Sequence, residues 1–410
     1  MIHQNRRKEL LSQLDDDSIV IVSTNPEQRR SGNVHYPFRP HSDFYYLTGF
    51  DEPEALAVIT SSSYTILLRP RDKKREIWNG ERLGVDNAPE ALNADKSYTI
   101  DLLKNKLPKL MKGYKSIYFD PKPHSIDDEI IKILVLANKK YKSIEPILHE
   151  MRLIKGSDEI SIMQKAADIS AKAHKIAMQK VKPGMFEYEL QSVFDGYFKQ
   201  HNSEHAYTPI VAGGKNACVL HYIKNNKVLK DNELVLVDAG CEVEYYASDI
   251  TRTFPINGKF SKAQKQIYQL VLDAQIAAIN NIKPGAKINK PHKAVTDIIK
   301  QGLIDLGILQ AEGELSQFYM HGTGHWIGLD VHDVGKYKNN DKHREFTPGM
   351  ITTVEPGIYI RSDDKIDPIY HNIGVRIEDD VLVTEDGNTV LTKSLVKEIK
   401  DIESIMQLQE

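Results

Sequence analysis

Five residues in the second half of the chain constrain its fold more than any other feature. They are Asp238, Asp249, His325, Glu355 and Glu378. Asp238 ends the apolar run 234–237, and Glu378 ends a strand-like segment that begins at Gly374. A carboxylate at the end of a buried strand is costly unless something compensates its charge. Four such carboxylates and one imidazole therefore predict that the fold gathers them around a shared cation, and the number of donors favours two cations.

The donor set also restricts the kind of metal. Four carboxylates and one histidine supply too much oxygen for a typical structural zinc site, which prefers cysteine and histidine. A catalytic pair of manganese, cobalt, iron or zinc ions fits better. Two ions about 3.5–4 Å apart can lower the pKa of a shared water and hold hydroxide at neutral pH. Without a cation, the clustered carboxylates would repel one another and some would take up protons.

Local context adds detail to this hypothesis. Glu355 precedes Pro356 and Gly357, a tight turn that aims its side chain, and strand alternation places Arg376 on the same face as Glu378. The segment 321–332 contains three histidines and three glycines: His321, His325, His332, Gly322, Gly324 and Gly328. Glycine allows the backbone to approach a ligand closely, so this loop is a candidate part of the site. A further histidine, His221, lies in a separate segment.

Other catalytic classes lack support in the sequence. There is no Gly-x-Ser-x-Gly, no phosphate-binding loop with its lysine and no dinucleotide fingerprint. Cys218 and Cys241 have no activating partner nearby in sequence, which favours packing roles, and a disulfide between them stays open. A net charge of −3 gives no bulk attraction to nucleic acid or to an anionic membrane. With no secretory signal and no run of about 18–20 apolar residues, we expect a soluble cytoplasmic protein without nucleic-acid or membrane partners.

The 410 residues fit two domains. Short β-branched runs at 18–22, 55–59 and 116–119 predict strands, and 130–140 predicts a helix, so the first part is a mixed α/β domain. We place the domains at 1–152 and 153–410.

The second domain contains a repeated signature. A helix with Ser157 as its N-cap is expected to end near Lys182-Pro183-Gly184, and a helix from Ser261 is expected to end near Lys283-Pro284-Gly285, 101 residues later. Each is followed by a second helical stretch, at 187–200 and 291–306, and then by strand-like runs. The pattern indicates an internal duplication.

At this point the chain resembles a known family, the Xaa-Pro aminopeptidases (aminopeptidase P). The motifs that carry the resemblance cover nearly the whole chain: 39–50, 78–84, 237–240, 248–253, 321–333, 354–359 and 374–379. The resemblance implies an α+β or α/β fold, in which the N-terminal mixed α/β domain precedes a pita-bread catalytic domain of the creatinase/aminopeptidase type. It also implies two divalent ions, usually manganese. Asp249 and Glu378 would bridge them, Asp238 would hold one, and His325 and Glu355 the other.

The resemblance further implies a mechanism. A metal-bridging hydroxide would attack the carbonyl before proline, releasing the N-terminal residue from peptides with proline in second position. Glu355 would act as general base, and His221 and His332 would contact the substrate and stabilise the tetrahedral intermediate. Because a proline nitrogen carries no N–H, a dedicated pocket is needed. Candidates to line or support that pocket are His321, Tyr359 and Arg376.

In the same family the first domain mediates oligomerisation and closes a neighbour's active site, so we expect a homodimer or homotetramer. Three residues there keep no assigned role: Asp43, Trp78 and Arg152. Alternatives are a prolidase, which cleaves Xaa-Pro dipeptides, a methionine aminopeptidase, and a metal-free creatinase-like hydrolase or peptide-binding scaffold. Trp326 and the segment 42–50 favour the aminopeptidase, and the complete set of five ligand candidates disfavours the metal-free alternative.

Overall fold

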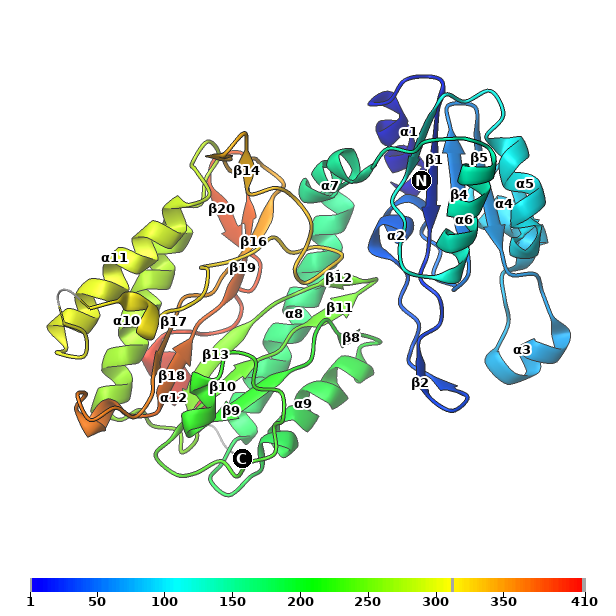
Figure 1. Ribbon diagram of the computed structural model, residues 1–410. Helices are drawn as coiled ribbons and strands as arrows, with labels where there is room; N and C mark the ends of the chain where they lie inside the picture. The colour runs from blue at the N-terminus through cyan, green and yellow to red at the C-terminus, as the bar shows by residue number, and fades with distance from the viewer. Residues whose placement is uncertain (1, 311–312, 408–410) are drawn as a thin grey trace. The chain divides into compact units, whose positions relative to one another are not determined.

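The computed structural model describes residues 2–310 and 313–407, and the chain divides into two compact units, Met1–Arg152 and Leu153–Glu410. The first unit is built on a five-stranded mixed sheet with strand order β6-β5-β4-β1-β7 (Figure 1). The strands are β1 (Ser18–Ser23), β4 (Leu56–Thr60), β5 (Ser63–Leu68), β6 (Lys96–Thr99) and β7 (Ser116–Phe119), with a separate hairpin of β2 (Arg29–Ser31) and β3 (Val34–His35). The helices are α1 (Ile2–Ser12), α2 (Ser42–Thr48), α3 (Lys73–Asn79), α4 (Gly84–Leu92), α5 (Leu103–Leu110), α6 (Ser125–Leu136) and α7 (Glu145–Leu153).

Strands β1, β4 and β7 confirm the three predicted runs, and their β-branched side chains pack in the core of this unit. The helix predicted over 130–140 is only partly correct, because α6 ends at Leu136. Asn138 has a φ of 50°, a left-handed conformation that a helix cannot continue through.

The second unit contains five α-helices in its described part. They are α8 (Ser157–Lys180), α9 (Glu187–Gln200), α10 (Lys262–Asn280), α11 (Lys290–Asp305) and α12 (Ile399–Gln407). Ser261 caps α10 as predicted, accepting a hydrogen bond from the Gln264 amide. The predicted N-cap of α8 was wrong by one residue: the cap is Gly156, whose amide donates to the Glu159 carboxylate of the first turn.

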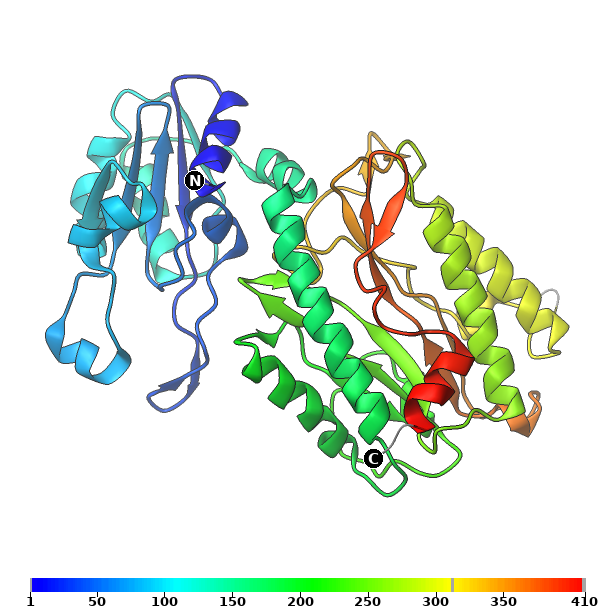
Figure 2. The same ribbon diagram turned by 180° about the vertical axis from the view of Figure 1, so that it is seen from behind.

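The strands of this unit pair antiparallel in small sheets, in the orders β13-β10-β9, β12-β11-β8, β16-β19-β20, β17-β18 and β14-β15. Their bounds are β8 (Glu204–His205), β9 (Ile210–Gly213), β10 (Leu234–Asp238), β11 (Cys241–Val243), β12 (Tyr246–Ala247), β13 (Thr251–Pro255), β14 (Lys338–Asn339), β15 (Lys342–His343), β16 (Ile351–Val354), β17 (Gly357–Ile360), β18 (Ile373–Arg376), β19 (Asp379–Val383) and β20 (Asn388–Val390). Figure 2 shows α8, α10 and α12 in front of these strands, and Figure 1 shows the strands from the opposite side, so the helices cover one face.

The two halves of this unit repeat one another in hydrogen bonding as well as in element order. The Gly184 amide donates to Leu229 O (2.9 Å), and the Gly285 amide donates to Phe346 O (3.0 Å). Both glycines have positive φ, 91° and 75°, which explains why each Lys-Pro-Gly signature ends in glycine. The predicted internal duplication therefore appears as two equivalent turns, each closed by a distant segment.

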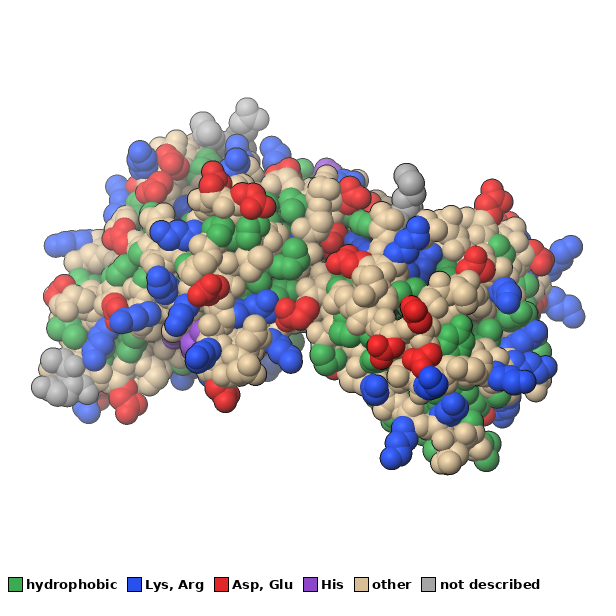
Figure 3. Space-filling model, turned by 90° about the horizontal axis from the view of Figure 1, so that it is seen from above, with side chains coloured by type: hydrophobic (Ala, Val, Ile, Leu, Met, Phe, Trp, Pro, Cys, Tyr) green, Lys and Arg blue, Asp and Glu red, His purple; other side chains and the backbone are tan. Residues whose placement is uncertain are grey.

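The surface matches the near-neutral charge of the chain. On the face drawn in Figure 3, basic and acidic side chains are interspersed rather than gathered into single-sign patches. Among the described residues, no helix combines the length and the apolar character that crossing a membrane requires.

Candidate metal centre

A cavity of about 300 Å³ in the second unit collects the five candidate ligands, four of them at or near the ends of strands. Asp238 is the last residue of β10, Asp249 lies just before β13, Glu355 joins β16 to β17, and Glu378 joins β18 to β19. His325 comes from the loop between α11 and β14. One donor atom each from Asp249, His325 and Glu378 lie within 4.8 Å of one another, which is close enough for one cation to meet all three. Asp238 and Glu355 line the same cavity.

Two glycines bring these ligands together by allowing backbones to touch. A Cβ on Gly240 would lie 1.9 Å from the carbonyl oxygen of Ser248, and a Cβ on Gly324 would lie 2.0 Å from that of Thr353. No other residue fits at either position. The Gly240–Ser248 contact holds the segment after Asp238 against the segment that carries Asp249. The Gly324–Thr353 contact places His325 beside β16.

The electrostatics of the cluster show an excess of negative charge. Burial, together with repulsion from Asp249, Glu355 and Asp238, raises the pKa of Glu378 well above its ordinary value. Burial is also the main reason that the pKa of Glu355 rises to about 7 and that the pKa of Asp238 is raised. These shifts mean that the protein's own groups do not compensate the carboxylates fully, although Arg376 Nη2 donates to Asp238 Oδ2 at 2.6 Å.

His325 is the group that responds to this excess. Burial lowers its pKa, but hydrogen bonding and attraction to Asp249 outweigh burial and raise the pKa to about 9. Its Nε2 lies 3.5 Å from Asp249 Oδ2 and 3.6 Å from Glu355 Oε1. Its Nδ1 lies 3.0 Å from Trp326 O, which leaves Nε2 directed at the carboxylates as a ligand nitrogen. A divalent cation would supply the positive charge that a proton on His325 otherwise supplies.

Three groups that support the ligands were missed by sequence reasoning. The hydroxyl of Tyr207 lies 2.7 Å from Asp238 Oδ1 and 2.6 Å from Asp249 Oδ1. Thr251 Oγ1 donates to Glu378 Oε2 at 2.6 Å, and the Asp249 amide donates to Asp380 Oδ2 at 3.0 Å. Thr251 belongs to the motif at 248–253, but nothing in the sequence around Tyr207 or Asp380 indicated a place beside the cavity.

The predicted substrate-facing residues fall into two groups. His221, His321, His332 and Arg376 line the cavity, and the rings of His325 and His332 meet edge to face with centroids 4.4 Å apart. Tyr359 is 1 % exposed and lies behind the cavity. Its hydroxyl accepts from Arg376 Nη1 (3.0 Å) and lies 2.8 Å from His321 Nε2. Burial lowers the pKa of His321 to about 4, so its ring is neutral at physiological pH.

The two cysteines are free and buried, so the disulfide that the sequence left open is not formed. Burial raises the pKa of each thiol to about 11, which agrees with packing roles.

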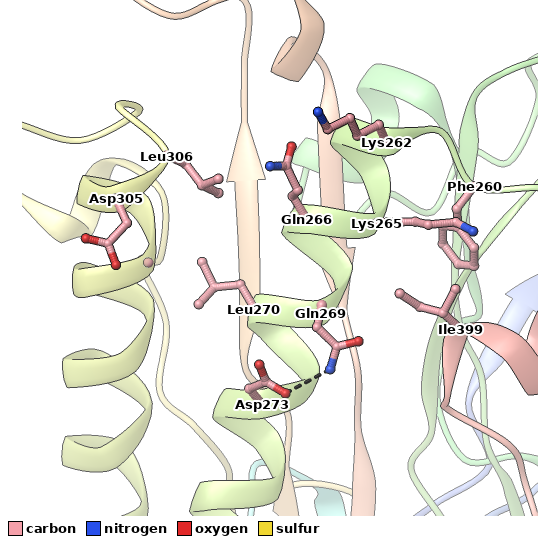
Figure 4. Close-up of a pocket in the computed structure, with 11 residues that line it drawn as sticks. Phe260, Lys262, Lys265, Gln266, Gln269, Leu270, Asp273, Asp305, Leu306 and Ile399 are labelled. Carbon is pink, nitrogen blue, oxygen red and sulfur yellow. Dashed lines mark hydrogen bonds between the residues drawn. The ribbon is translucent and has the colours of Figure 1, made fainter.

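A second hollow, of about 780 Å³, opens between α10, α11 and the start of α12 (Figure 4). Figure 4 shows Leu270 pointing from α10 toward α11. Asp273 Oδ1, which lines this hollow, accepts a hydrogen bond from Gln269 Nε2 of the same helix at 2.8 Å. In the part of the chain that the structure describes, the single group of three or more possible metal donors lies in the smaller cavity, so the chemistry is assigned to that cavity.

Comparison with known proteins agrees with this geometry. The model of metallopeptidase family M24 matches residues 161–385, and the model of the aminopeptidase P N-terminal domain matches residues 3–118. A Xaa-Pro aminopeptidase of Haemophilus influenzae is 46% identical over 415 residues, covering 98% of this chain and 96% of the relative. One of Escherichia coli is 41% identical over 427 residues, covering 98% and 97%. A solved structure of an aminopeptidase of Pseudomonas aeruginosa matches with a TM-score of 0.96 and 40% identity, covering 99% of each chain.

Proposed function

The chain belongs to metallopeptidase family M24, with an aminopeptidase P N-terminal domain, and from this premise we propose how its residues divide the work of the reaction. The expected fold class, a mixed α/β domain followed by a pita-bread domain, is confirmed. The enzyme is a metal-dependent aminopeptidase that releases the N-terminal residue from peptides with proline in the second position. The observation that carries this function is the cluster of Asp249, His325 and Glu378 in the cavity of a chain so similar to these relatives.

The proposed cofactor is a pair of divalent ions, with manganese as the expected metal. Asp249 and Glu378 would bridge both ions. Asp238 would hold one ion, and His325 Nε2 and Glu355 the other. The oxygen-rich donor set suits such ions, and the raised pKa values of Glu378 and Glu355 are what an uncompensated ligand cluster would have. When bound, the ions supply Lewis acidity and lower the pKa of a water.

The chain's own residues would move the protons and hold the substrate. Glu355 is the proposed general base, and its pKa of about 7 suits a group that takes a proton and returns it near neutral pH. His221 and His332, which both line the cavity, would donate to the oxyanion as it develops. The His321–Tyr359–Arg376 chain of hydrogen bonds would shape the proline pocket, with neutral His321 facing the substrate.

The first unit has a proposed role in assembly as a homodimer or homotetramer and in closing a neighbour's active site. Trp78 is 86 % exposed on α3, and the adjacent Ile77 is 83 % exposed. These two large exposed apolar side chains support the proposal, because contiguous apolar surface is found at protein–protein interfaces. Asp43 and Arg152, by contrast, form a buried ion pair (Oδ1 to Nη1, 2.7 Å) inside this unit, which indicates a structural role. A cytoplasmic location remains part of the proposal.

The experiment that tests the function compares an Xaa-Pro-Xaa tripeptide with the matching Xaa-Pro dipeptide, with manganese and with a chelator. Release of the first residue from the tripeptide, abolished by the chelator, is the expected result. Cleavage confined to the dipeptide would instead identify a prolidase. Metal analysis of the active protein tests the proposed pair, because two ions per chain are expected.

A further inference from the structure

A buried carboxylate outside the metal centre holds the loop that carries His221. Glu187, the first residue of α9, has an exposed fraction of 0 %. Its Oε1 accepts from the Gly213 amide (2.9 Å) and from Asn216 Nδ2 (2.8 Å). Its Oε2 accepts from the Tyr222 hydroxyl (2.8 Å) and from the Lys227 amide (2.9 Å). All four donors are uncharged, and no cation among the described residues pairs with Glu187. Hydrogen bonds and the N-terminus of α9 therefore compensate the negative charge of this carboxylate.

The four donors lie at both ends of one segment. Gly213 and Asn216 precede His221 in the chain, whereas Tyr222 and Lys227 follow it. Most side chains between 221 and 228 are exposed, so apolar burial does little to fix this part of the loop. No hydrogen bond to another described residue holds the His221 ring, which nevertheless lines the cavity. Its place therefore depends on the backbone, which Glu187 fixes on both sides of His221 and which buried Asn225 fixes further along through Pro209 O (2.9 Å).

The fold itself does not require this carboxylate. In the second half of the unit, Ile288 occupies the position equivalent to Glu187. The Glu187 amide donates to Lys227 O at 2.9 Å, and the Ile288 amide donates to Arg344 O at 3.1 Å, within two equivalent turns. The same turn thus forms with an apolar side chain at this position. The carboxylate of Glu187 is therefore not required to form the turn, and it has another role.

We propose that Glu187 is a positioning residue for the reaction, acting through His221. This inference rests on the proposed role of His221 as a substrate-contacting group. A carboxylate suits the position because it offers acceptors only, and all four partners are donors. A glutamine would turn its NH₂ group toward two of those donors and release one end of the segment.

The test is a double-mutant cycle on kcat/KM for an Xaa-Pro-Xaa tripeptide, using Glu187→Gln, His221→Ala and the double variant in the manganese-loaded enzyme. We expect Glu187→Gln alone to lower kcat/KM on the order of tenfold, with metal content unchanged. In the His221→Ala background it should change kcat/KM by less than about twofold, because the group it positions is gone. Glu189→Gln is the matched control: it removes one charge from the same helix turn and should leave kcat/KM unchanged. Among the described residues, the Glu189 carboxylate accepts only from the Phe186 amide.

The outcomes separate the two hypotheses. Equal losses from Glu187→Gln in both backgrounds, or loss of bound metal, would overturn the inference. If His221→Ala alone left kcat/KM unchanged, the proposed role of His221 would fail first, and the inference with it. Should Glu187→Gln not fold, Tyr222→Phe removes a single donor and carries the same prediction of a loss that disappears in the His221→Ala background.

Discussion

Glu378 and Asp379 are neighbours in the chain, and both carboxylates are almost fully buried, with exposed fractions of 2 % and 1 %. Their electrostatic situations are nevertheless opposite. Burial and repulsion from other acids raise the pKa of Glu378 well above its ordinary value. For Asp379, attraction to Arg252 and Lys397 outweighs burial and lowers the pKa to about 2. One carboxylate faces the cavity with too little positive charge around it, and the next faces protein cations.

The contacts of Asp379 show what full compensation requires. Its Oδ1 accepts from Arg252 Nη2 and from Thr392 Oγ1, each at 2.7 Å. Its Oδ2 accepts from Lys397 Nζ (2.7 Å) and from Gln275 Nε2 (3.0 Å). Glu378 has Thr251 Oγ1 at 2.6 Å instead. A buried acid that serves stability is therefore neutralised by cations and donors of the chain itself, whereas one that serves a cofactor keeps negative charge that the chain does not neutralise.

The largest expected effect comes from changing Glu378, the carboxylate that faces the cavity. Glu378→Gln should lower kcat/KM by at least about 10³-fold, because a proposed bridging ligand loses its charge. Bound metal should decrease in parallel, as measured by elemental analysis. The metal-free variant should be no less stable than the metal-free wild type, because the substitution relieves repulsion.

Glu385→Gln, in the exposed turn after β19, is the control and should change neither activity nor metal content. A metal-free Glu378→Gln protein that was several kcal/mol less stable than the metal-free wild type would contradict the conclusion that Glu378 serves the cofactor and Asp379 the stability of the fold.

Changing Asp379, the carboxylate that pairs with protein cations, should lower the free energy of unfolding. Asp379→Asn leaves Arg252 and Lys397 facing a neutral group, and breaking a buried pair in this way costs on the order of 3–5 kcal/mol. Denaturant unfolding of the metal-free protein measures this loss. Lys397→Gln should cost less, because the lysine side chain is 23 % exposed whereas Arg252 is fully buried. Equal costs for the two variants would contradict the expectation that the partly exposed Lys397 contributes less to stability than the buried carboxylate it pairs with.

The sequence predicted the cavity better than it predicted its surroundings. Asp238, Glu355 and Glu378 stand at the ends of apolar segments, and that local context sufficed to expect a shared cation. Tyr207 was not predicted, because it reaches Asp238 across 31 residues and Asp249 across 42.

The same reason explains why the sequence did not separate Glu378 from Asp379. The cations that compensate Asp379 lie 127 and 18 residues away in the chain. Element types were predictable from periodicity. Their ends depended on single residues, such as Asn138 after α6 and Gly156 before α8.

Removing the metal should produce a smaller effect than Asp379→Asn. A ligand that binds only the folded state stabilises it by about 2.7 kcal/mol at a hundred times its Kd. We therefore expect chelation to lower the unfolding temperature of the second unit, and manganese to restore it. Calorimetry of the Glu378→Gln variant sharpens the test, since its metal-dependent shift should largely disappear. Asp379→Asn should keep most of the shift, because neither Asp379 nor any of its four hydrogen-bond partners lines the cavity.

The smallest expected effect is on the pH dependence of stability. Here the contributions of Glu355, in the cavity, and of Asp379, outside it, should have opposite signs. In the metal-free protein the raised pKa of Glu355, about 7, means that the folded state binds its proton more tightly than the unfolded state does. Relative to Glu355→Gln, the free energy of unfolding of the metal-free wild type should rise as the pH falls from 8 to 5, on the order of 1–2 kcal/mol. The lowered pKa of Asp379 gives the reverse: its contribution is complete above about pH 4 and is lost as the pH falls toward 2. Unfolding curves of both pairs, wild type against Glu355→Gln and against Asp379→Asn, measure the two slopes. Adding manganese should abolish the first slope and leave the second unchanged, because a cation in the cavity stabilises the ionised form of Glu355 but does not reach Asp379.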